Sequence, residues 1–437
     1  MTNYLHKVLP PQYSHVNKVY CLLAATVFCA LPLCSTEAAA ENILKYDGTT
    51  NIHGNAKTWA AKNEYDGIDI RVTGVDGGYY TDTTEALVLN NQTLNVKGKG
   101  KFVSIINTAQ NKQIDNNGGI YAKGGSTVNF TDVDSIYIAA IAGKEGGNDS
   151  TVISAKDPGR DFKGYTNIVN ISGNTVQLIG SIDVMHSLGS VFFNRNARHT
   201  VNAALSGSDS FWYGSAIGET DERTTVNLSL ADGATWIFNA GKSTLNAGGI
   251  IRNLKLDKGV VLFADAEVWE TYRKTVIKGT DYVLANYRDH NERYSQVEIR
   301  SLTGPGGIFK MDLDWQSNNG ERQYTEKSDF ITIGTAEDGS HQIVEFDMGK
   351  AHLDEMKNGD KLYFASVESG NTTFSTNADG EVNRADELYR FGLHTQSEED
   401  ETDQLTYWFL TKSIGSANEN VDFLNNAVLA TFSLASD

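Results

Sequence analysis

A triplet of threonine, then valine or leucine, then asparagine recurs along the chain and restricts its fold more than any other feature. In one copy isoleucine replaces the threonine. Successive copies are 34, 41, 32, 25 and 19 residues apart, counted between Asn95, Asn129, Asn170, Asn202, Asn227 and Asn246. These steps are too irregular for a propeller or another array of fixed period. They suit a solenoid whose turns, of about 20 residues or more, carry outer loops of different lengths.

The stretch Thr225–Leu230, TVNLSL, shows how a triplet fits into a strand. Apolar and polar residues alternate strictly, so one set of side chains points inward and the other outward. The asparagines are predicted on the outer face or at a turn, Trp236 as a packing residue and Lys242 in the turn before the next triplet. The side chains predicted to stack inward on two successive turns are Val226, Leu228, Leu230 and Leu245.

Composition and element lengths indicate the fold class. The chain has 41 glycines and only 5 prolines, which is typical of many short strands joined by tight turns. No long amphipathic helix separates the strands between residues 42 and 300, so an ordinary parallel α/β fold is excluded. We predict an all-β, right-handed parallel β-helix, with an antiparallel sandwich array as the alternative.

The sequence predicts four regions. Residues 1–40 are a signal peptide, 41–300 a β-helix, 301–415 a denser and more aromatic β block that closes the stack, and 416–437 a short helical linker. Within the third region, Ser328–Ile333 and Gln342–Phe346 are predicted to be a strand pair around the turn AEDGS. The helix is predicted from an apolar stripe of period 3 to 4 residues, formed by Val421, Leu424, Val428 and Phe432.

The N-terminus has the pattern of a secretory signal. An apolar run over 19–34 precedes Ala38-Ala39-Ala40 and is shorter than the roughly 20 residues that a spanning helix needs. Cleavage is predicted between Ala40 and Glu41, with Ala38 as the other small residue of the site. An uncleaved anchor and a lipoprotein are the weaker alternatives. All three cysteines lie inside the apolar run, so the mature chain has none and its stability must come from packing.

Charge limits the partners. The net charge is −18 at pH 7, so the chain has no overall basic field to attract nucleic acid or an anionic lipid surface. We therefore expect no nucleic-acid partner.

Two short motifs resemble catalytic or nucleotide-binding sequences. Gly241-Lys242-Ser243-Thr244 is similar to the end of a phosphate-binding loop, but such a loop requires glycine at position 236, where this chain has Trp236. We interpret it as a turn. The stretch 207–210, GSDS, has the letters of a serine-protease nucleophile loop in a different order, with His186 and His199 nearby in sequence. We predict no catalytic or cofactor-binding residues.

Acidic, histidine and aromatic residues are interpreted as structural. The pairs Asp132/Asp134 and Asp312/Asp314 are predicted to lie on solvated strand faces, and the acidic run 398–403 in a hairpin loop. No histidine spacing supports a metal site. In the aromatic pairs Trp212-Tyr213 and Tyr79-Tyr80, one ring is expected to pack and the other to lie on the surface. The mature histidines are His53, His186, His199, His290, His341, His352 and His394.

Several segments together resemble the passenger of a pertactin-like bacterial autotransporter. Residues 230–265, LADGATWIFNAGKSTLNAGGIIRNLKLDKGVVLFAD, are similar to the recurring segment of that family. Residues 302–345, with their L-x-G-x-G-G-x-F and S-D-F-I-T-I strands, look like its C-terminal β-helix block. Gly392 to Leu410 look like its closing hairpin. The resemblance covers about 224–432.

The resemblance implies type V secretion, in which the chain crosses the periplasm and then an outer-membrane translocator barrel before it folds. Residues 416–437 look like the linker helix and the beginning of that barrel. A complete barrel of at least eight strands of about ten residues is absent from this chain, so we expect either a truncation or a barrel elsewhere as a partner.

The leading functional hypothesis is a non-enzymatic, adhesin-like passenger, secreted or at the cell surface and outer membrane. Its repeated surface would bind a host molecule or a glycan. A second hypothesis is a β-helical polysaccharide lyase or hydrolase, which requires a groove that holds acids together with Arg195, Arg198 or Lys163. A third is a truncated remnant that stays in the periplasm.

Overall fold

The structure is a computed structural model that describes most of the chain between residues 42 and 417. The predicted signal peptide, with Ala38, Ala40 and Glu41, and the predicted C-terminal helix lie outside the described residues. The described ranges are 42–51, 63–75, 84–109, 117–142, 151–156, 164–184, 197–217, 222–238, 248–263, 283–284, 294–322, 328–382 and 389–417.

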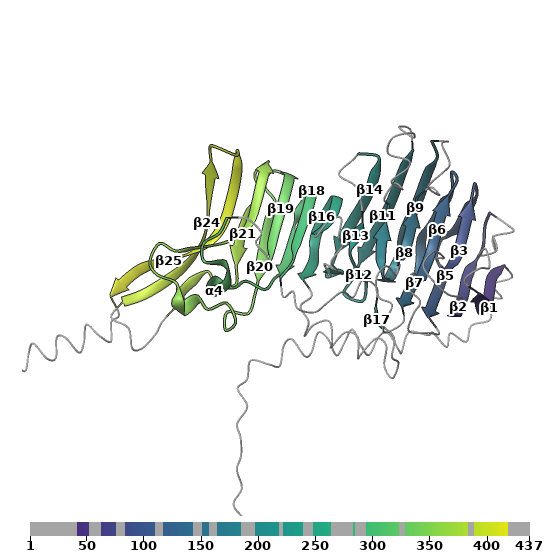
Figure 1. Cartoon of the computed structure of the whole chain (residues 1–437), viewed down its shortest axis with the longest axis horizontal. Helices are drawn as coiled ribbons and strands as arrows, with labels where there is room; N and C mark the ends of the chain where they lie inside the picture. The colour runs from purple at the N-terminus through teal and green to yellow at the C-terminus, as the bar shows by residue number, and fades with distance from the viewer. Residues whose placement is uncertain are drawn as a thin grey trace, which may run out of the picture.

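The described residues form an all-β solenoid whose strands lie side by side along its long axis (Figure 1). The chain passes in turn over three faces, and the strands from β1 to β22, apart from the short β17, pair in parallel with the corresponding strands of the next turn. This confirms an all-β fold of stacked parallel strands, similar to a β-helix, and rules out the antiparallel sandwich array for this part of the chain.

One face, here called the ladder face, carries the predicted triplets. Its strands are β4 (Thr93–Lys97), the first parts of β7 (Thr127–Ala142) and β9 (Thr166–Ile179), β11 (Arg198–Ser206), β14 (Thr224–Ala231), the first parts of β16 (Gly248–Phe263) and β18 (Gln296–Lys310), β19 (Phe330–Ala336) and β21 (Lys361–Ser369).

The two other faces complete each turn. The second face comprises β1 (Ile43–Asn51), β2 (Gly67–Val75), β5 (Phe102–Ala109), the later parts of β7 and β9, β12 (Phe211–Gly214), β15 (Thr235–Phe238), the later parts of β16 and β18, β20 (His341–Glu345) and β22 (Thr373–Thr376). The third face comprises β3 (Thr84–Asn90), β6 (Asn117–Lys123), β8 (Thr151–Ala155), β10 (Ser181–Asp183) and β13 (Ala216–Ile217).

The core consists of columns of apolar side chains that run along the axis. Strand alternation points every second residue inward, and the parallel register places like positions above one another. One column on the ladder face is Leu94, Val128, Val169, Val201 and Val226, all at most 2% exposed. The predicted inward positions Val226, Leu228 and Leu230 are confirmed as buried, whereas Leu245 and Lys242 lie outside the described residues.

Aromatic rings fill the middle of the stack. The rings of Trp212 and Trp236, on successive turns, are parallel within 6° and have centroids 5.1 Å apart. Each indole N–H donates 2.9 Å to a backbone carbonyl of the preceding turn, that of Gly180 for Trp212 and that of Gly214 for Trp236. Trp236 is therefore a packing residue, as predicted. The expectation that one ring of the Trp212-Tyr213 pair lies on the surface is wrong, because both rings are fully buried.

The segments after residue 301 continue the same stack. The predicted boundary falls inside β18, which pairs with β16 before it and β19 after it. The predicted strands near 330 and 343 exist as β19 and β20, but they do not pair with each other. They lie on different faces of one turn, where β19 pairs with β21 and β20 with β22. The Ala-Glu-Asp-Gly-Ser segment is thus a corner and not a hairpin turn.

An antiparallel hairpin covers the C-terminal end of the ladder face. Strands β24 (Tyr389–Asp400) and β25 (Leu405–Ala417) pair with each other, and β25 pairs in antiparallel fashion with β21. The edge of the last parallel strand on this face is thereby occupied. The remaining short elements are β17 (Val283–Leu284), β23 (Gly380–Val382), helix α4 (Trp315–Asn318) and the 3-10 helix η2 (Leu353–Glu355). Within the described ranges, no helix is both long and apolar enough to cross a membrane.

Candidate functional site

The outer surface of the ladder face carries a continuous row of hydrogen-bonded asparagines, here called the asparagine ladder. Each side-chain N–H donates to the side-chain oxygen of the preceding asparagine, over 2.6–2.8 Å. The first member donates instead to the backbone carbonyl of Asn63, at 3.1 Å. The ladder consists of Asn95, Asn129, Asn170, Asn202, Asn227 and Asn253.

The last member of the ladder is not the asparagine that the triplet spacing predicts. Asn227 pairs in register with Asn253, so Asn253 occupies the place predicted for Asn246, which lies outside the described residues. The reason is a local break in alternation, since Ile251 and Leu254 are both buried and two residues between them are not.

Removing an asparagine from the middle of the ladder is expected to destabilise the protein more than removing its last member. Asn202→Ala deletes two hydrogen bonds and leaves half-buried amide groups on both neighbours unsatisfied, for a cost of about 1–2 kcal/mol. Asn253→Ala deletes one bond at an exposed end and should cost about half as much. Denaturant unfolding followed by circular dichroism measures both values, and equal costs would contradict a connected ladder.

A shallow groove of about 330 Å³ runs beside the ladder, across β7, β9, β11, β14 and β16. One wall is formed by the ladder amides of Asn170, Asn202, Asn227 and Asn253. The floor lies over positions whose side chains point into the core, Ile171, Ala203 and Leu228. The other wall is a row of small side chains that follow one another on successive turns, here called the small-residue row: Thr131, Ser172, Ala204 and Ser229.

A lysine stands at each end of the small-residue row. Lys97 pairs in register with Thr131, and Lys255 pairs with Ser229 and lines the groove. Both side chains are exposed, and neither forms an ion pair with another described residue. Five turns separate them, a distance of roughly 24 Å.

The groove does not have the composition required by the lyase or hydrolase hypothesis. Its described lining contains one basic residue, Lys255, and no carboxylate. Of the basic residues named for that hypothesis, Arg198 is exposed at the start of β11, while Lys163 and Arg195 lie outside the described residues. Acidic residues lie at the corner that follows the row, where Asp132 and Asp232 have left-handed backbone conformations.

The structure does not bring the serine and histidine of the protease-like motif together. His199 lies at the buried start of β11, with Nδ1 3.1 Å from the Asn167 amide nitrogen. Ser210 lies beyond the other end of the same strand, after roughly 23 Å of extended chain. Its buried hydroxyl donates to the Ser206 carbonyl at 2.7 Å and accepts the Val176 backbone N–H at 3.1 Å. Both side chains hold turns in place. His186 and the Gly-Lys-Ser-Thr turn at 241–244 lie outside the described residues.

The two Asp-x-Asp pairs differ from each other. Asp132 and Asp134 are exposed, as predicted, but they lie at a corner where the strand register is interrupted and Asp132 has a left-handed backbone, not on a regular strand face. Asp314 is only 3% exposed, so its prediction as a solvated residue is wrong. The strand ends at Lys310, and Asp314 caps α4 by accepting the Gln316 N–H at 3.1 Å. Its carboxylate also accepts the Tyr294 hydroxyl proton at 2.7 Å and lies 2.8 Å from His352 Nδ1.

Metal ligands are not grouped in the part of the chain that the structure describes, where no cluster of three or more histidine, cysteine, aspartate or glutamate side chains occurs. The described histidines lie on different elements: His199 on β11, His341 on β20, His352 at the start of η2 and His394 on β24. His341, for example, contacts the hydroxyls of Thr373 and Ser375 at 2.9 and 3.0 Å. His53, His290 and the Tyr79-Tyr80 pair lie outside the described residues.

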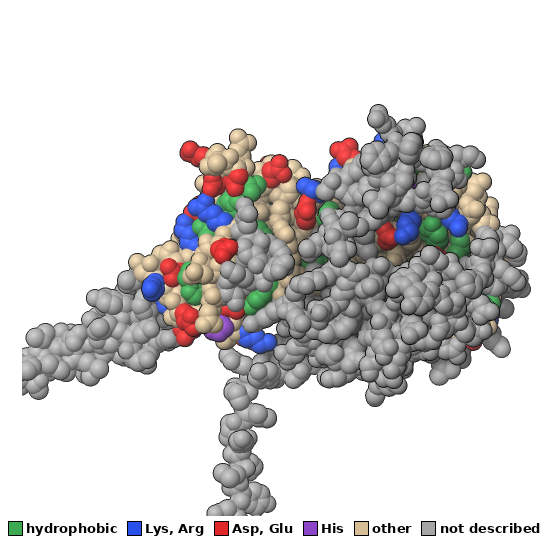
Figure 2. All heavy atoms as spheres, viewed as in Figure 1, with side chains coloured by type: hydrophobic (Ala, Val, Ile, Leu, Met, Phe, Trp, Pro, Cys, Tyr) green, Lys and Arg blue, Asp and Glu red, His purple; other side chains and the backbone are tan. Residues whose placement is uncertain are grey.

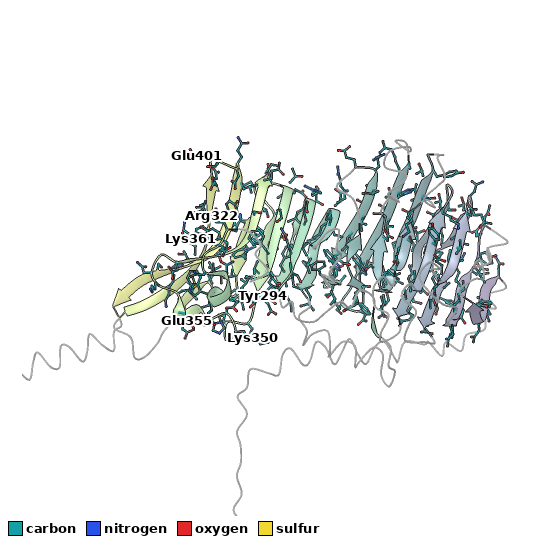
Figure 3. All side chains as sticks on the ribbon, in the orientation of Figure 1. Tyr294, Arg322, Lys350, Glu355, Lys361 and Glu401 are labelled. Atoms are coloured by element: carbon teal, nitrogen blue, oxygen red, sulfur yellow. The ribbon has the colours of Figure 1, made fainter. Side chains whose placement is uncertain are left out.

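The prediction of a hairpin loop over the acidic run 398–403 is correct only in part, because residues 398–400 end strand β24 and are paired with β25, and only 401–404 form the turn. The carboxylates at the end of β24 take part in an ionic cluster. The Arg322 guanidinium lies 2.9 Å from Glu398, contacts Asp400, and lies over the rings of Tyr363 and Tyr407 at 5.8 and 5.7 Å. Lys361 contacts Glu398, which also accepts the Tyr363 hydroxyl proton at 2.6 Å. Figure 3 shows Arg322 and Lys361 near the hairpin, with Glu401 at its tip, and Figure 2 shows mixed acidic and basic side chains over this end.

This cluster should make the closing hairpin sensitive to acid. Partial burial acts to raise the pKa of Glu398, but hydrogen bonds from Lys361 and Tyr363 and the charges of Lys361 and Arg322 outweigh it and lower the pKa. The pKa of Asp400 is lowered first by the backbone N–H of Thr402 and further by Arg322. Because both folded-state pKa values are lowered, their stabilisation is complete above the unfolded values of about 4 and disappears as the pH falls through the folded ones.

We expect Arg322→Gln to lower the thermal midpoint at pH 7, with a difference from wild type that shrinks below about pH 4 as the two carboxylates become protonated. Calorimetry of both proteins between pH 7 and pH 2 measures this difference. Lys45→Gln, an exposed change on β1, serves as the control and should leave the midpoint unchanged. A difference that stays constant across the range would show that Arg322 does not act through these carboxylates.

No protein-family model matches this chain, and neither a curated protein nor a solved structure does.

Proposed function

We propose that this chain is the passenger of a pertactin-like bacterial autotransporter, secreted or displayed at the cell surface and outer membrane, and that it acts by adhesin-like binding without catalysis. The observation that carries this proposal is the repeated outer surface of the ladder face, where four successive turns each present a ladder asparagine beside one groove. Such a surface favours extended contact with a large ligand over chemistry in a deep pocket.

Further features support the delivery route. The apolar run and the Ala-x-Ala site predict export, with cleavage between Ala40 and Glu41. The residues after 41 contain no cysteine, so no disulfide loop can form in them before the chain passes through an outer-membrane translocator barrel. The stacked parallel turns and closing hairpin suit a right-handed β-helix, the hand that connections between parallel strands almost always take.

Protease treatment of intact cells tests this proposal. A surface passenger should be cleaved while a periplasmic marker stays intact, and the N-terminus of the exported chain should begin at Glu41. Deleting residues 19–34 should keep the chain inside the cell, with its N-terminal segment uncleaved. A chain that is protected in intact cells and cleaved only after the outer membrane is opened would refute surface display and favour the periplasmic alternative.

A further inference from the structure

The groove of the ladder face has the dimensions and chemistry of a site for a long, thin, hydroxyl-rich ligand. It spans five turns spaced about 4.8 Å apart, so it repeats at nearly the length of one sugar residue in an extended chain. Each ladder amide uses one N–H and one oxygen lone pair for its neighbours, which leaves a second N–H and further lone pairs for a ligand. Rows of amides and hydroxyls are well suited to binding sugar hydroxyls.

The charges of the groove select among such ligands. Lys97 and Lys255 mark the two ends of the small-residue row, and the positions between them are uncharged. The adjoining corner carries Asp132, Asp232 and Asp257 with one lysine, Lys258, so it is acidic on balance. Asp232 accepts a hydrogen bond from the Ser206 hydroxyl at 3.0 Å. A densely charged polyanion would meet these carboxylates along the rim. A polysaccharide whose acidic groups are separated by neutral sugars could place an acidic group near the lysine at each end and keep its charges away from the carboxylates of the corner.

The lining also disfavours nucleic acid. Proteins that hold single strands place aromatic rings where bases can stack, and no aromatic residue lines this groove. The overall charge of −18 adds repulsion of any polymer with a charge on every unit.

We infer that the groove binds a linear, sparsely acidic polysaccharide, which lies along the solenoid axis between the asparagine ladder and the small-residue row, with acidic groups near Lys97 and Lys255. This inference rests on the proposed adhesin-like function and names its ligand class and its site.

Binding of gellan, a linear polysaccharide with one uronate in each multi-sugar repeat, tests the inference by biolayer interferometry with the purified mature chain. Polygalacturonate, dextran and poly(dT) are the densely charged, neutral and nucleic-acid comparisons. Ala204→Leu places a larger side chain in the groove from an exposed position and should weaken gellan binding at least about tenfold, equivalent to 1.4 kcal/mol. Thr335→Leu, an exposed change on β19, is the matched control and should not weaken it.

The lysines give a second, independent test. Lys97→Gln and Lys255→Gln should each weaken gellan binding several-fold and reduce its dependence on salt, while Lys45→Gln should change neither. Circular dichroism and the thermal midpoint establish that each variant is folded. The inference is overturned if gellan fails to bind, if Ala204→Leu and Thr335→Leu behave alike, or if polygalacturonate or poly(dT) binds as tightly as gellan.

These outcomes are separable from those of the cell experiment. Surface display without gellan binding would remove the ligand assignment and leave the proposed location intact. Gellan binding by a chain that never reaches the surface would preserve the site and refute the location.

Discussion

Replacing Trp236 by alanine is expected to lower the free energy of unfolding by about 3–5 kcal/mol. The side chain is fully buried, stacks on Trp212 and meets the edge of Phe238 at a centroid distance of 5.2 Å. Its removal leaves a cavity in the middle of the solenoid, and it also leaves the Gly214 carbonyl without the indole N–H that now donates to it at 2.9 Å. Denaturant unfolding followed by far-UV circular dichroism measures the change.

Two further variants separate the causes. Trp236→Phe keeps an aromatic ring but loses the N–H donor, so it should fall between wild type and alanine. Thr235→Ala alters the neighbouring, half-buried position on the same strand and should cost less than about 1 kcal/mol. A surface substitution typically changes the free energy of unfolding by less than about 1 kcal/mol. If Trp236→Ala has an effect as small as this, the aromatic stack does not hold these turns together.

The second large effect is expected at Gly306, where β18 passes close to β20. Its φ of 140° lies in a region that side chains rarely adopt, and an added Cβ would be 1.8 Å from the His341 carbonyl oxygen. Backbone of two adjacent turns would have to separate. Gly306→Ala should therefore cost more than about 3 kcal/mol, the upper range for backbone strain alone, in the same denaturant experiment.

Gly339 provides the matched control for this change. Its φ is also positive, at 79°, but nothing lies within 4 Å of an added Cβ. Gly339→Ala should thus cost only the conformational term of about 1–2 kcal/mol. If the two alanine variants are equally stable, the close approach of the strands at Gly306 is not the source of the effect.

The sequence predicts the inward columns well because alternation is a local property. Val226, Leu228 and Leu230 could be assigned to the core without knowing what they contact. The position of Asn253 in the ladder could not be assigned, because two adjacent outward residues interrupt the alternation there. The burial of Asp314 could not be predicted either, because it depends on contacts with Tyr294 and His352, which are 20 and 38 residues away in the chain.

The groove itself leaves a signal in the sequence that can be recognised once the register is known. The residue two positions after each ladder asparagine lies in the small-residue row or at its ends, from Lys97 through Ala204 to Lys255. Each of these residues is ordinary in its own strand. Only the stacking of turns that are 25 to 41 residues apart in the chain aligns them, so local pattern alone could not assemble the site.

The asparagine ladder has a direction, because every amide donates toward the N-terminal end of the stack. An amide in the middle cannot turn over alone, since the exchange of its nitrogen and oxygen would break the bonds on both sides at once. Hydrogen bonds linked in one sense also polarise one another. The ladder therefore joins turns that are distant in sequence into a single polar unit. Because all of its hydrogen bonds run in one direction, a whole turn can be added or removed and the amides of the other turns keep their orientation.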